Sequence, residues 1–185
     1  MRVTSGKAKG VYLKVPSRGM VRPTTSLVKQ AILSMLQTCC LNESRILDLY
    51  AGSGALGIES LSQGGGWVDF VDQNRECCRI IDDNLRRTGF LSNAHVYCHE
   101  VGEIIPKLSS KYDVVFADPP YSDTSISSVL TLLAKSDLVD RDTIIVVCHS
   151  SRVSLGVACS GLELIKQRRY GDTMVSMYRR SELWA

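Results

Sequence analysis

Two short segments of the sequence carry residue types that could bind a nucleoside cofactor and hold an amino group for reaction. Residues 48–57, Asp-Leu-Tyr-Ala-Gly-Ser-Gly-Ala-Leu-Gly, contain the G-x-G-x-x-G spacing of nucleotide-binding loops. Residues 118–121, Asp-Pro-Pro-Tyr, directly follow the apolar segment YDVVFA. Glycines let a backbone approach a ligand closely and prolines hold a backbone rigid, so each segment could present its polar groups in a fixed direction.

The first segment predicts a cofactor that contains a nucleoside. Asp72 ends the next strand-like segment, WVDFVD, where an acid binds ribose hydroxyls in folds of this kind. Asp48 lies just before the glycines, where its carboxylate would repel a pyrophosphate but attract an ammonium or a sulfonium group. The sequence therefore favours S-adenosylmethionine over a nicotinamide dinucleotide. The alternative is a tight turn with only a structural role.

The second segment has the chemistry to hold the exocyclic amino group of a base. Such a group has two N–H donors and a lone pair that is delocalised into the ring. The Asp118 carboxylate and the Pro119 carbonyl would accept both hydrogens and help to localise the lone pair, while Pro120 fixes the backbone. Tyr121 can stack on the base, which contributes about 1–3 kcal/mol. The alternative is a rigid turn with a packed tyrosine.

The surrounding pattern predicts an α/β fold with a mostly parallel sheet, which would place both segments at the carboxyl ends of strands. Strand-like and helix-like segments alternate from residue 45 onward. We expect strands at 45–50, 67–71, 94–98, 112–117 and 143–149, and helices at 55–63, 75–88, 104–108 and 125–135. Two further strands, 161–170 and 173–178, flank Gly171-Asp172, which predicts an antiparallel hairpin.

The first 42 residues are expected to form a basic extension that packs on this core. Strand-like pieces before Pro16 are separated by Gly6-Lys-Ala-Lys-Gly10, which predicts a small β-hairpin. Residues 23–26 offer helix-capping side chains before apolar residues at helical spacing. We therefore expect a hairpin and a helix over 1–42 and a core over 43–185, which together function as a single domain.

Charge is distributed unevenly along the 185 residues, although the net charge is only +3. Residues 1–42 hold seven basic residues and no acidic one, residues 43–165 hold ten and seventeen, and residues 166–185 hold five and two. Basic ends on an acidic body are typical of a protein whose ends face a polyanion, and the alternative is a solvated arm without a partner. The candidate RNA-binding residues are Arg2, Lys7, Lys9, Arg18, Arg22, Arg168 and Arg169.

Composition argues against a membrane protein and against a metal site. No apolar run approaches the roughly 20 residues that span a bilayer, and the first residues lack the apolar core of a signal peptide, so we expect a cytoplasmic protein. The seven cysteines include adjacent pairs but no C-x-x-C spacing. We expect free thiols in a reducing compartment rather than zinc ligands.

Taken together, the two segments resemble those of class I S-adenosylmethionine-dependent amino-methyltransferases. The whole chain resembles the RsmD-like family, the bacterial 16S ribosomal RNA guanine-N2 methyltransferases. The segments that carry this resemblance are Arg2 with Gly6 and Gly10, Arg22-Pro-Thr24, DLYAGSGALGIESLSQGG, DPPY and RRYGDTMVSMY. It implies a three-layer Rossmann-like fold with a seven-stranded, mostly parallel sheet that ends in an antiparallel hairpin. It also implies methyl transfer to the N2 amino group of a guanine, with ribosomal RNA or the small ribosomal subunit as partner.

The resemblance also implies roles for individual residues. The catalytic residues would be Asp118, Pro119, Pro120 and Tyr121. The residues expected to bind S-adenosylmethionine are Asp48, Ala51, Gly52, Ser53 and Gly54 near its methionine part, Asp72 at its ribose, Glu100 at its adenine, and Gln73, Val101 and Asp118. The chain departs from the family pattern twice. It has His99-Glu100 where Gly-Asp is usual, and Cys148-His149 where Glu-His is frequent, so no acid acts at the latter place.

The expected reaction is a direct displacement in which the guanine N2 attacks the methyl group while Asp118 and Pro119 hold its hydrogens. Proton loss can follow, so no histidine base is needed, and we expect His95 and His99 to be surface or packing residues. Three alternatives remain. An adenine-N6 DNA or protein-glutamine methyltransferase would share the chemistry of DPPY. A nicotinamide oxidoreductase would not explain DPPY, and a catalytically silent RNA-binding module would not explain the glycine loop.

Overall fold

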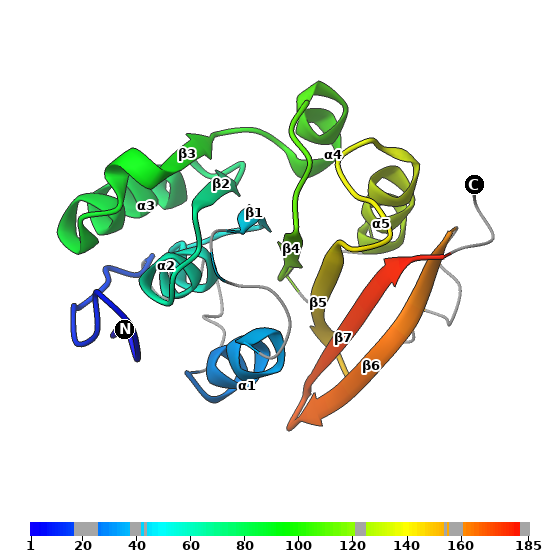
Figure 1. Cartoon of the computed structure of the whole chain (residues 1–185), viewed down its shortest axis with the longest axis horizontal. Helices are drawn as coiled ribbons and strands as arrows, with labels where there is room; N and C mark the ends of the chain where they lie inside the picture. The colour runs from blue at the N-terminus through cyan, green and yellow to red at the C-terminus, as the bar shows by residue number, and fades with distance from the viewer. Residues whose placement is uncertain are drawn as a thin grey trace.

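One sheet organises the chain, whose computed structural model describes residues 1–16, 26–37, 42, 44–120, 125–153, 155 and 161–181. Within these residues the sheet has seven strands in the order β3-β2-β1-β4-β5-β7-β6. The strands are β1 (Arg45–Leu49), β2 (Trp67–Val71), β3 (Ala94–Tyr97), β4 (Val114–Ala117), β5 (Ile144–Ser150), β6 (Leu162–Tyr170) and β7 (Thr173–Arg180). Figure 1 shows that the sheet crosses the molecule with helices on both of its sides.

The central strands are parallel and buried on both faces, which explains why their sequences are continuously apolar. All four residues of β4 and the last four of β1 are buried. Leu49 of β1 lies opposite Val71 of β2 on one side and Ala117 of β4 on the other. These three strands therefore end at the same level, and the loops that follow them lie together at one edge of the sheet.

Helices cover both faces of the sheet and bury two apolar layers. One layer contains side chains of α1 (Ser26–Gln37), α2 (Ala55–Ser62) and α3 (Arg75–Thr88). The other contains side chains of α4 (Val101–Ile104) and α5 (Ile126–Lys135), which lie together beyond β4 in Figure 1. The predicted three-layer α/β fold is confirmed. In the described part of the chain, no helix is both long and apolar enough to cross a membrane.

Helix α3 illustrates how local sequence sets the bounds of an element. The Asn74 side chain accepts a hydrogen bond from the Glu76 N–H at 2.8 Å and so caps the start of the helix. Gly89 ends it in the left-handed conformation, with a φ of 78°. Arg86 and Arg87 place positive charge in the last turn, where it favours the helix dipole. The predicted bounds of this helix, 75–88, are confirmed.

The last two strands form the predicted antiparallel hairpin. Tyr170 pairs with Thr173 across Gly171-Asp172, and Gly171 adopts a positive φ of 61°, as a tight hairpin turn requires. Strand β7 pairs antiparallel with β5, which leaves β6 at the edge of the sheet. The stretch from Lys166 to Arg169 on β6 is exposed.

The main differences between the structure and the predicted elements concern three segments. The helix expected at 104–108 begins at Val101, because Glu100 caps it, and continues as the 3-10 turn η2 (Ile105–Lys107). A further 3-10 turn, η1 (Leu91–Asn93), precedes β3. The expected N-terminal hairpin is reduced to an isolated antiparallel bridge between Arg2 and Tyr12. It is short because the N–H groups of Thr4 and Lys7 donate to α2 instead of to a second strand. The capping residues expected before α1, up to residue 25, lie outside the described residues.

Candidate active site

Three aspartates meet at the edge of the sheet where β1, β2 and β4 end. Asp48 lies in β1, and Asp72 and Asp118 directly follow β2 and β4. The Ala51 N–H donates to Val71 O at 3.1 Å and thereby fastens the loop after β1 to β2. The Asp118 N–H lies 3.5 Å from Leu49 O, which continues the pairing between β1 and β4. The structure thus brings together three of the residues that the sequence predicts for one site.

The glycine loop is shaped by backbone conformation and held by two of these carboxylates. Gly52 and Gly54 adopt positive φ values of 57° and 73°, which glycine tolerates without strain. The Gly52 N–H donates to Asp72 at 2.8 Å, and the Gly57 N–H donates to Asp48 at 3.0 Å. The absence of a side chain at Gly57 also matters for packing. A Cβ there would lie 2.4 Å from the Phe70 ring, so glycine lets α2 pack closely on β2.

Asp48 is a buried carboxyl that lies close to two further carboxylates, those of Asp72 and Asp118. Burial above all, together with the negative charges of Asp118 and Asp72, raises the pKa of this carboxyl from 3.8 to about 8, against the opposing hydrogen bond from Gly57. The side chain is only 2% exposed. A cationic group bound at this edge would stabilise the ionised form of Asp48. The residues present therefore fit a ligand with a sulfonium or an ammonium group, as S-adenosylmethionine has.

Asp72 is placed where it can serve both the loop and a ligand. It is 9% exposed, and its two oxygens accept from the N–H groups of Gly52 and Asn74, each at 2.8 Å. A carboxylate has about four lone-pair sites, so each oxygen can still accept a hydroxyl from a ribose. Gln73, the next residue, is exposed. Both residues remain predicted cofactor ligands.

Glu100 and Val101 begin α4 rather than project freely from a strand. The two Glu100 carboxylate oxygens accept from the N–H groups of Gly102 at 3.1 Å and Glu103 at 3.0 Å. Glu100 is exposed, whereas Val101 is buried at 3% exposure. The contact between Glu100 and an adenine stays a prediction, because capping uses one lone pair of each oxygen and leaves others available.

The residues of the second motif that the structure describes lie directly after β4. Asp118 is half-buried, Pro119 is buried and Pro120 is exposed. Tyr121, the predicted stacking residue, lies outside the described residues. Asp118 is close enough to Asp48 for its charge to raise the pKa of that carboxyl. The first part of this motif therefore borders the predicted cofactor site, as methyl transfer between the two would require.

Two residues at the end of β5 lie beside this site. Burial raises the pKa of the Cys148 thiol, and the nearby charges of Asp118 and Asp48 raise it further, so it stays protonated. Burial lowers the pKa of His149, whose Nε2 lies 2.9 Å from Ser176 Oγ on β7. Neither residue adds a charge to the site. Among the described residues, no three or more His, Cys, Asp or Glu side chains are grouped so that they could hold a metal ion.

The predicted RNA-binding residues that are described all lie on the surface. Arg2, Lys7, Lys9, Arg168 and Arg169 are exposed, whereas Arg18 and Arg22 lie outside the described residues. Two other basic residues of the extension are paired within the protein. Lys14 contacts Asp83 at 2.6 Å, and Lys29 contacts Glu59 at 3.3 Å. The positive charge that the extension offers to a partner is therefore smaller than its sequence suggests.

Three residues in or near the glycine loop and the helices beside it were not predicted from the sequence. Tyr50 adopts a positive φ of 57°, which is rare for a residue other than glycine, and its hydroxyl lies 3.5 Å from Ser125 Oγ at the start of α5. Asn84 of α3 donates to Ser53 O at 2.9 Å, and Glu59 is a fully buried acid in α2. The signal that could have found Glu59 is a lone acid in a helix whose other residues are small or apolar.

The strand order, the glycine loop after β1 and the antiparallel last hairpin define a Rossmann-like methyltransferase fold. The methyltransferase candidate yhhF from Escherichia coli has the same fold, with a TM-score of 0.86 and 25% identity over 98% of each chain. The chain belongs to the RsmD family, because the family model described as Conserved hypothetical protein 95 matches residues 1–179.

Two curated relatives resemble this chain over nearly its whole length. The rRNA methyltransferase candidate YlbH from Bacillus subtilis (strain 168) is 33% identical over 183 residues, which cover 97% of this chain and 99% of YlbH. The ribosomal RNA small subunit methyltransferase D from Escherichia coli (strain K12) is 25% identical over 180 residues, which cover 97% of this chain and 90% of that protein.

Proposed function

We propose that this protein uses S-adenosylmethionine to methylate the N2 amino group of a guanine in small-subunit ribosomal RNA. The observation that carries the proposal is the position of Asp118-Pro119 beside the glycine loop and the buried carboxyl of Asp48. The names of the relatives from Bacillus subtilis and Escherichia coli support an rRNA substrate. The choice of guanine N2 rests on the family resemblance and on the chemistry of the DPPY motif.

The cofactor would lie over the ends of β1 and β2. When bound, S-adenosylmethionine supplies an electrophilic methyl group on a sulfonium. Asp48 would stabilise the positive charge, and the loop from Ala51 to Gly54 would leave room for the methionine part. Asp72 would accept the ribose hydroxyls, with Gln73, Glu100 and Val101 nearer the adenine. Asp118, which lies close to Asp48, would then border the methyl group.

Asp118 and Pro119 would hold the guanine for reaction. The Asp118 carboxylate and the Pro119 carbonyl accept the two amino hydrogens, which directs the nitrogen lone pair toward the methyl group. Tyr121 is proposed to stack on the base and so fix its plane. Transfer of the methyl group to this nitrogen would break the bond between the methyl group and sulfur, and the nitrogen would then lose a proton to solvent. Positioning of this kind can lower the barrier by roughly 7–11 kcal/mol. No histidine base is required, because the proton leaves the nitrogen only after methyl transfer.

The exposed basic residues at both ends of the chain would position the RNA. Arg2, Lys7 and Lys9 lie on the N-terminal segment, and Arg168 and Arg169 lie on the edge strand β6. Such side chains bind phosphates and fix the orientation of a nucleic acid without reading its sequence. Arg18 and Arg22 are proposed to contribute in the same way.

A substrate assay combined with the Asp118→Ala variant tests the proposal. Tritiated methyl transfer is measured on small ribosomal subunits, naked ribosomal RNA and DNA, and the modified nucleoside is then identified. We expect N2-methylguanosine from a ribosomal substrate. Asp118→Ala should still bind S-adenosylhomocysteine in a calorimetric titration but lose most of the methyl transfer, because the amino group loses one acceptor. Near-normal turnover of this variant, or methylation of adenine in DNA, would contradict the proposal.

Substitutions of Tyr121 test the stacking role separately. Tyr121→Ala should weaken methyl transfer by roughly tenfold or more, because stacking contributes about 1–3 kcal/mol per base. Tyr121→Phe should retain much of the activity, since the ring remains. Equal losses in both variants, measured in the same transfer assay, would instead indicate that the hydroxyl group acts.

A further inference from the structure

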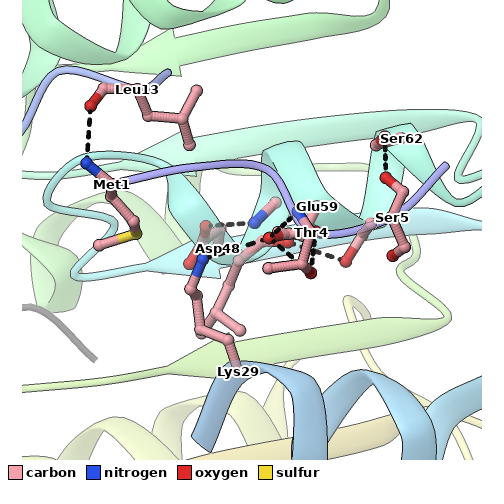
Figure 2. A network of polar contacts seen from close by, with 11 residues as sticks. Met1, Thr4, Ser5, Leu13, Lys29, Asp48, Glu59 and Ser62 are labelled. Carbon is pink, nitrogen blue, oxygen red and sulfur yellow. Dashed lines mark hydrogen bonds and ion pairs between the residues drawn. The ribbon is translucent and has the colours of Figure 1, made fainter. Parts of the chain in front are cut away.

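The N-terminal segment, defined here as residues 1–16, attaches to α2 through buried polar contacts. The Thr4 N–H and hydroxyl both donate to Glu59 at 3.0 Å. The Ser62 hydroxyl accepts from the Ala8 N–H at 2.9 Å and donates to Ser5 O. Figure 2 shows Thr4 and Ser5 of the segment lying against Glu59 and Ser62 of the helix. Since α2 begins directly after Gly54, these contacts reach the helix that the glycine loop starts.

Glu59 also binds a buried ammonium group from another element. Lys29 of α1 lies 3.3 Å from Glu59, and the two side chains are 1% and 0% exposed. Figure 2 shows Lys29 extending from α1 toward Glu59, with Asp48 in the same network. Removing one partner of a buried pair leaves an uncompensated charge, so such a pair strongly favours one arrangement of its elements. Glu59 therefore ties α1 and the N-terminal segment to α2.

Gly6 makes the approach of the segment to α2 unusually close. It has a φ of 76°, and a Cβ built on it would lie 1.7 Å from Ser62 O. The neighbouring Lys7 N–H donates to the same Ser62 oxygen at 2.8 Å. No residue with a side chain can occupy position 6 without moving the segment away from the helix.

The other end of the segment is joined to the glycine loop itself through Asn84 of α3. The Asn84 side chain accepts from the Lys14 N–H at 2.8 Å and donates to Lys14 O and to Ser53 O, both at 2.9 Å. Asn84 is fully buried, at 0% exposure. A single side chain thus uses both amide hydrogens to hold the segment and the loop together.

We propose that the N-terminal segment is a positioning element of the cofactor site and keeps the glycine loop in its binding geometry through Glu59 and Asn84. None of these residues is among those expected to touch the cofactor. The inference rests on the proposed binding of S-adenosylmethionine. If the segment moves, Asn84 and Glu59 lose hydrogen-bond partners in a buried environment, and the loop and α2 must shift to satisfy them. Cofactor affinity is then set in part by a segment at the periphery of the fold.

A pair of glycine substitutions within the segment tests this coupling. Gly6→Ala should weaken S-adenosylhomocysteine binding by roughly tenfold, the consequence of losing one or two buried hydrogen bonds. Gly10→Ala is the matched control, because Gly10 also has a positive φ, 91°, but a Cβ there meets no atom within 4 Å. It carries similar backbone strain without displacing the segment from α2. Affinities are measured calorimetrically below the unfolding temperature of each variant.

Asn84→Asp provides an independent test from the α3 side. The substitution keeps the size of the side chain but replaces the Nδ2 donor with an oxygen, so the bonds to Lys14 O and Ser53 O are lost. We expect affinity for S-adenosylhomocysteine to fall by roughly tenfold or more. Asp83→Asn is the control: it removes the negative charge from the surface ion pair with Lys14, beside Asn84, but leaves the buried contacts intact.

Hydrogen exchange of the unmodified protein tests the inference without depending on whether any variant folds. Saturation with S-adenosylhomocysteine should slow exchange at the paired amides of Val3, Gly10 and Leu13, as well as in the glycine loop. If the ligand protects the loop but not these amides, or if folded Gly6→Ala and Asn84→Asp bind with unchanged affinity, the inference is wrong and the proposed cofactor stands. If the unmodified protein does not bind the ligand, the proposed function fails first.

Discussion

Protonation of Asp48 should make the stability of the folded protein depend on pH. Its pKa of about 8 in the folded protein lies above its ordinary value of 3.8, so the folded state binds a proton that the unfolded state has released. The stability that this proton contributes is fully present below pH 4. It decreases as the pH rises from 4 to 8 and is absent at higher pH.

The ligand-free protein should therefore become less stable between pH 5 and pH 8. The decrease from Asp48 amounts to at most about 4 kcal/mol, at about 1.36 kcal/mol per pH unit. Asp48→Asn should lose this dependence, since its side chain is neutral throughout and can still accept from Gly57. Urea unfolding at several pH values measures the difference between the two proteins, which cancels the titration of other groups. Parallel stability curves would show that Asp48 is ionised throughout this range.

At the residue scale the sequence predicts the residues of the candidate site but not the residues that support them. Asp48, Asp72 and Asp118 are predictable because Asp48 precedes the glycine loop, Asp72 ends the next strand-like segment and Asp118 precedes two prolines. Loops at the carboxyl ends of parallel strands meet at one edge of the sheet. Asn84 carries no comparable local signal, and Glu59 differs from its neighbours only as a lone acid among small and apolar residues. Their partners Lys14 and Thr4 are 70 and 55 positions away in the chain, so the contacts exist only once the fold has formed.

At the scale of elements, the buried pair Lys29–Glu59 joins helices that are separate in sequence. Lys29→Met should destabilise the protein by about 3–5 kcal/mol, because Glu59 would remain buried without a counter-charge. The double variant with Glu59→Gln should be more stable than the sum of the two single losses predicts, by at least about 1 kcal/mol. Denaturant unfolding of the four proteins measures this coupling.

The exposed pair between Arg179 and Glu163 is a suitable control for that experiment. Its side chains are 52% and 41% exposed, so the same double-variant cycle should give a coupling below about 1 kcal/mol. Additive losses at Lys29 and Glu59, with no larger coupling than this surface pair, would mean that the helices are held together by apolar packing alone.

Most elements were predictable because their sequences combine the apolar spacing of a helix or a strand with residues that start or end it. The bounds of α3 follow from Asn74 and Gly89, and those of the last hairpin from Gly171-Asp172. The N-terminal hairpin is shorter than the sequence predicts because of contacts that form only in the folded protein. Its residues alternate as strands do, yet Thr4 and Lys7 donate their N–H groups to α2, and Gly6 allows that approach.

At the scale of the whole molecule, basic residues lie at both ends of the chain around an acidic body. Binding of a ribosomal RNA fragment should weaken linearly on a plot of log affinity against log salt concentration. Arg168→Ala should reduce the slope by about 0.7–0.9 if this side chain contacts one phosphate. Lys14→Ala is the control, because Lys14 already contacts Asp83 and should leave the slope unchanged. Equal slopes in all three proteins would indicate that Arg168 is only solvated.

The position of β6 at the edge of the sheet has a second consequence for the same arginines. An exposed edge strand presents unpaired backbone groups to which a strand of another molecule can add. Lys166, Arg168 and Arg169 place like charges along this edge, so two copies of the chain that approach there repel each other. The surface proposed to bind RNA thereby also keeps the protein from aggregating through its own sheet while no RNA is bound.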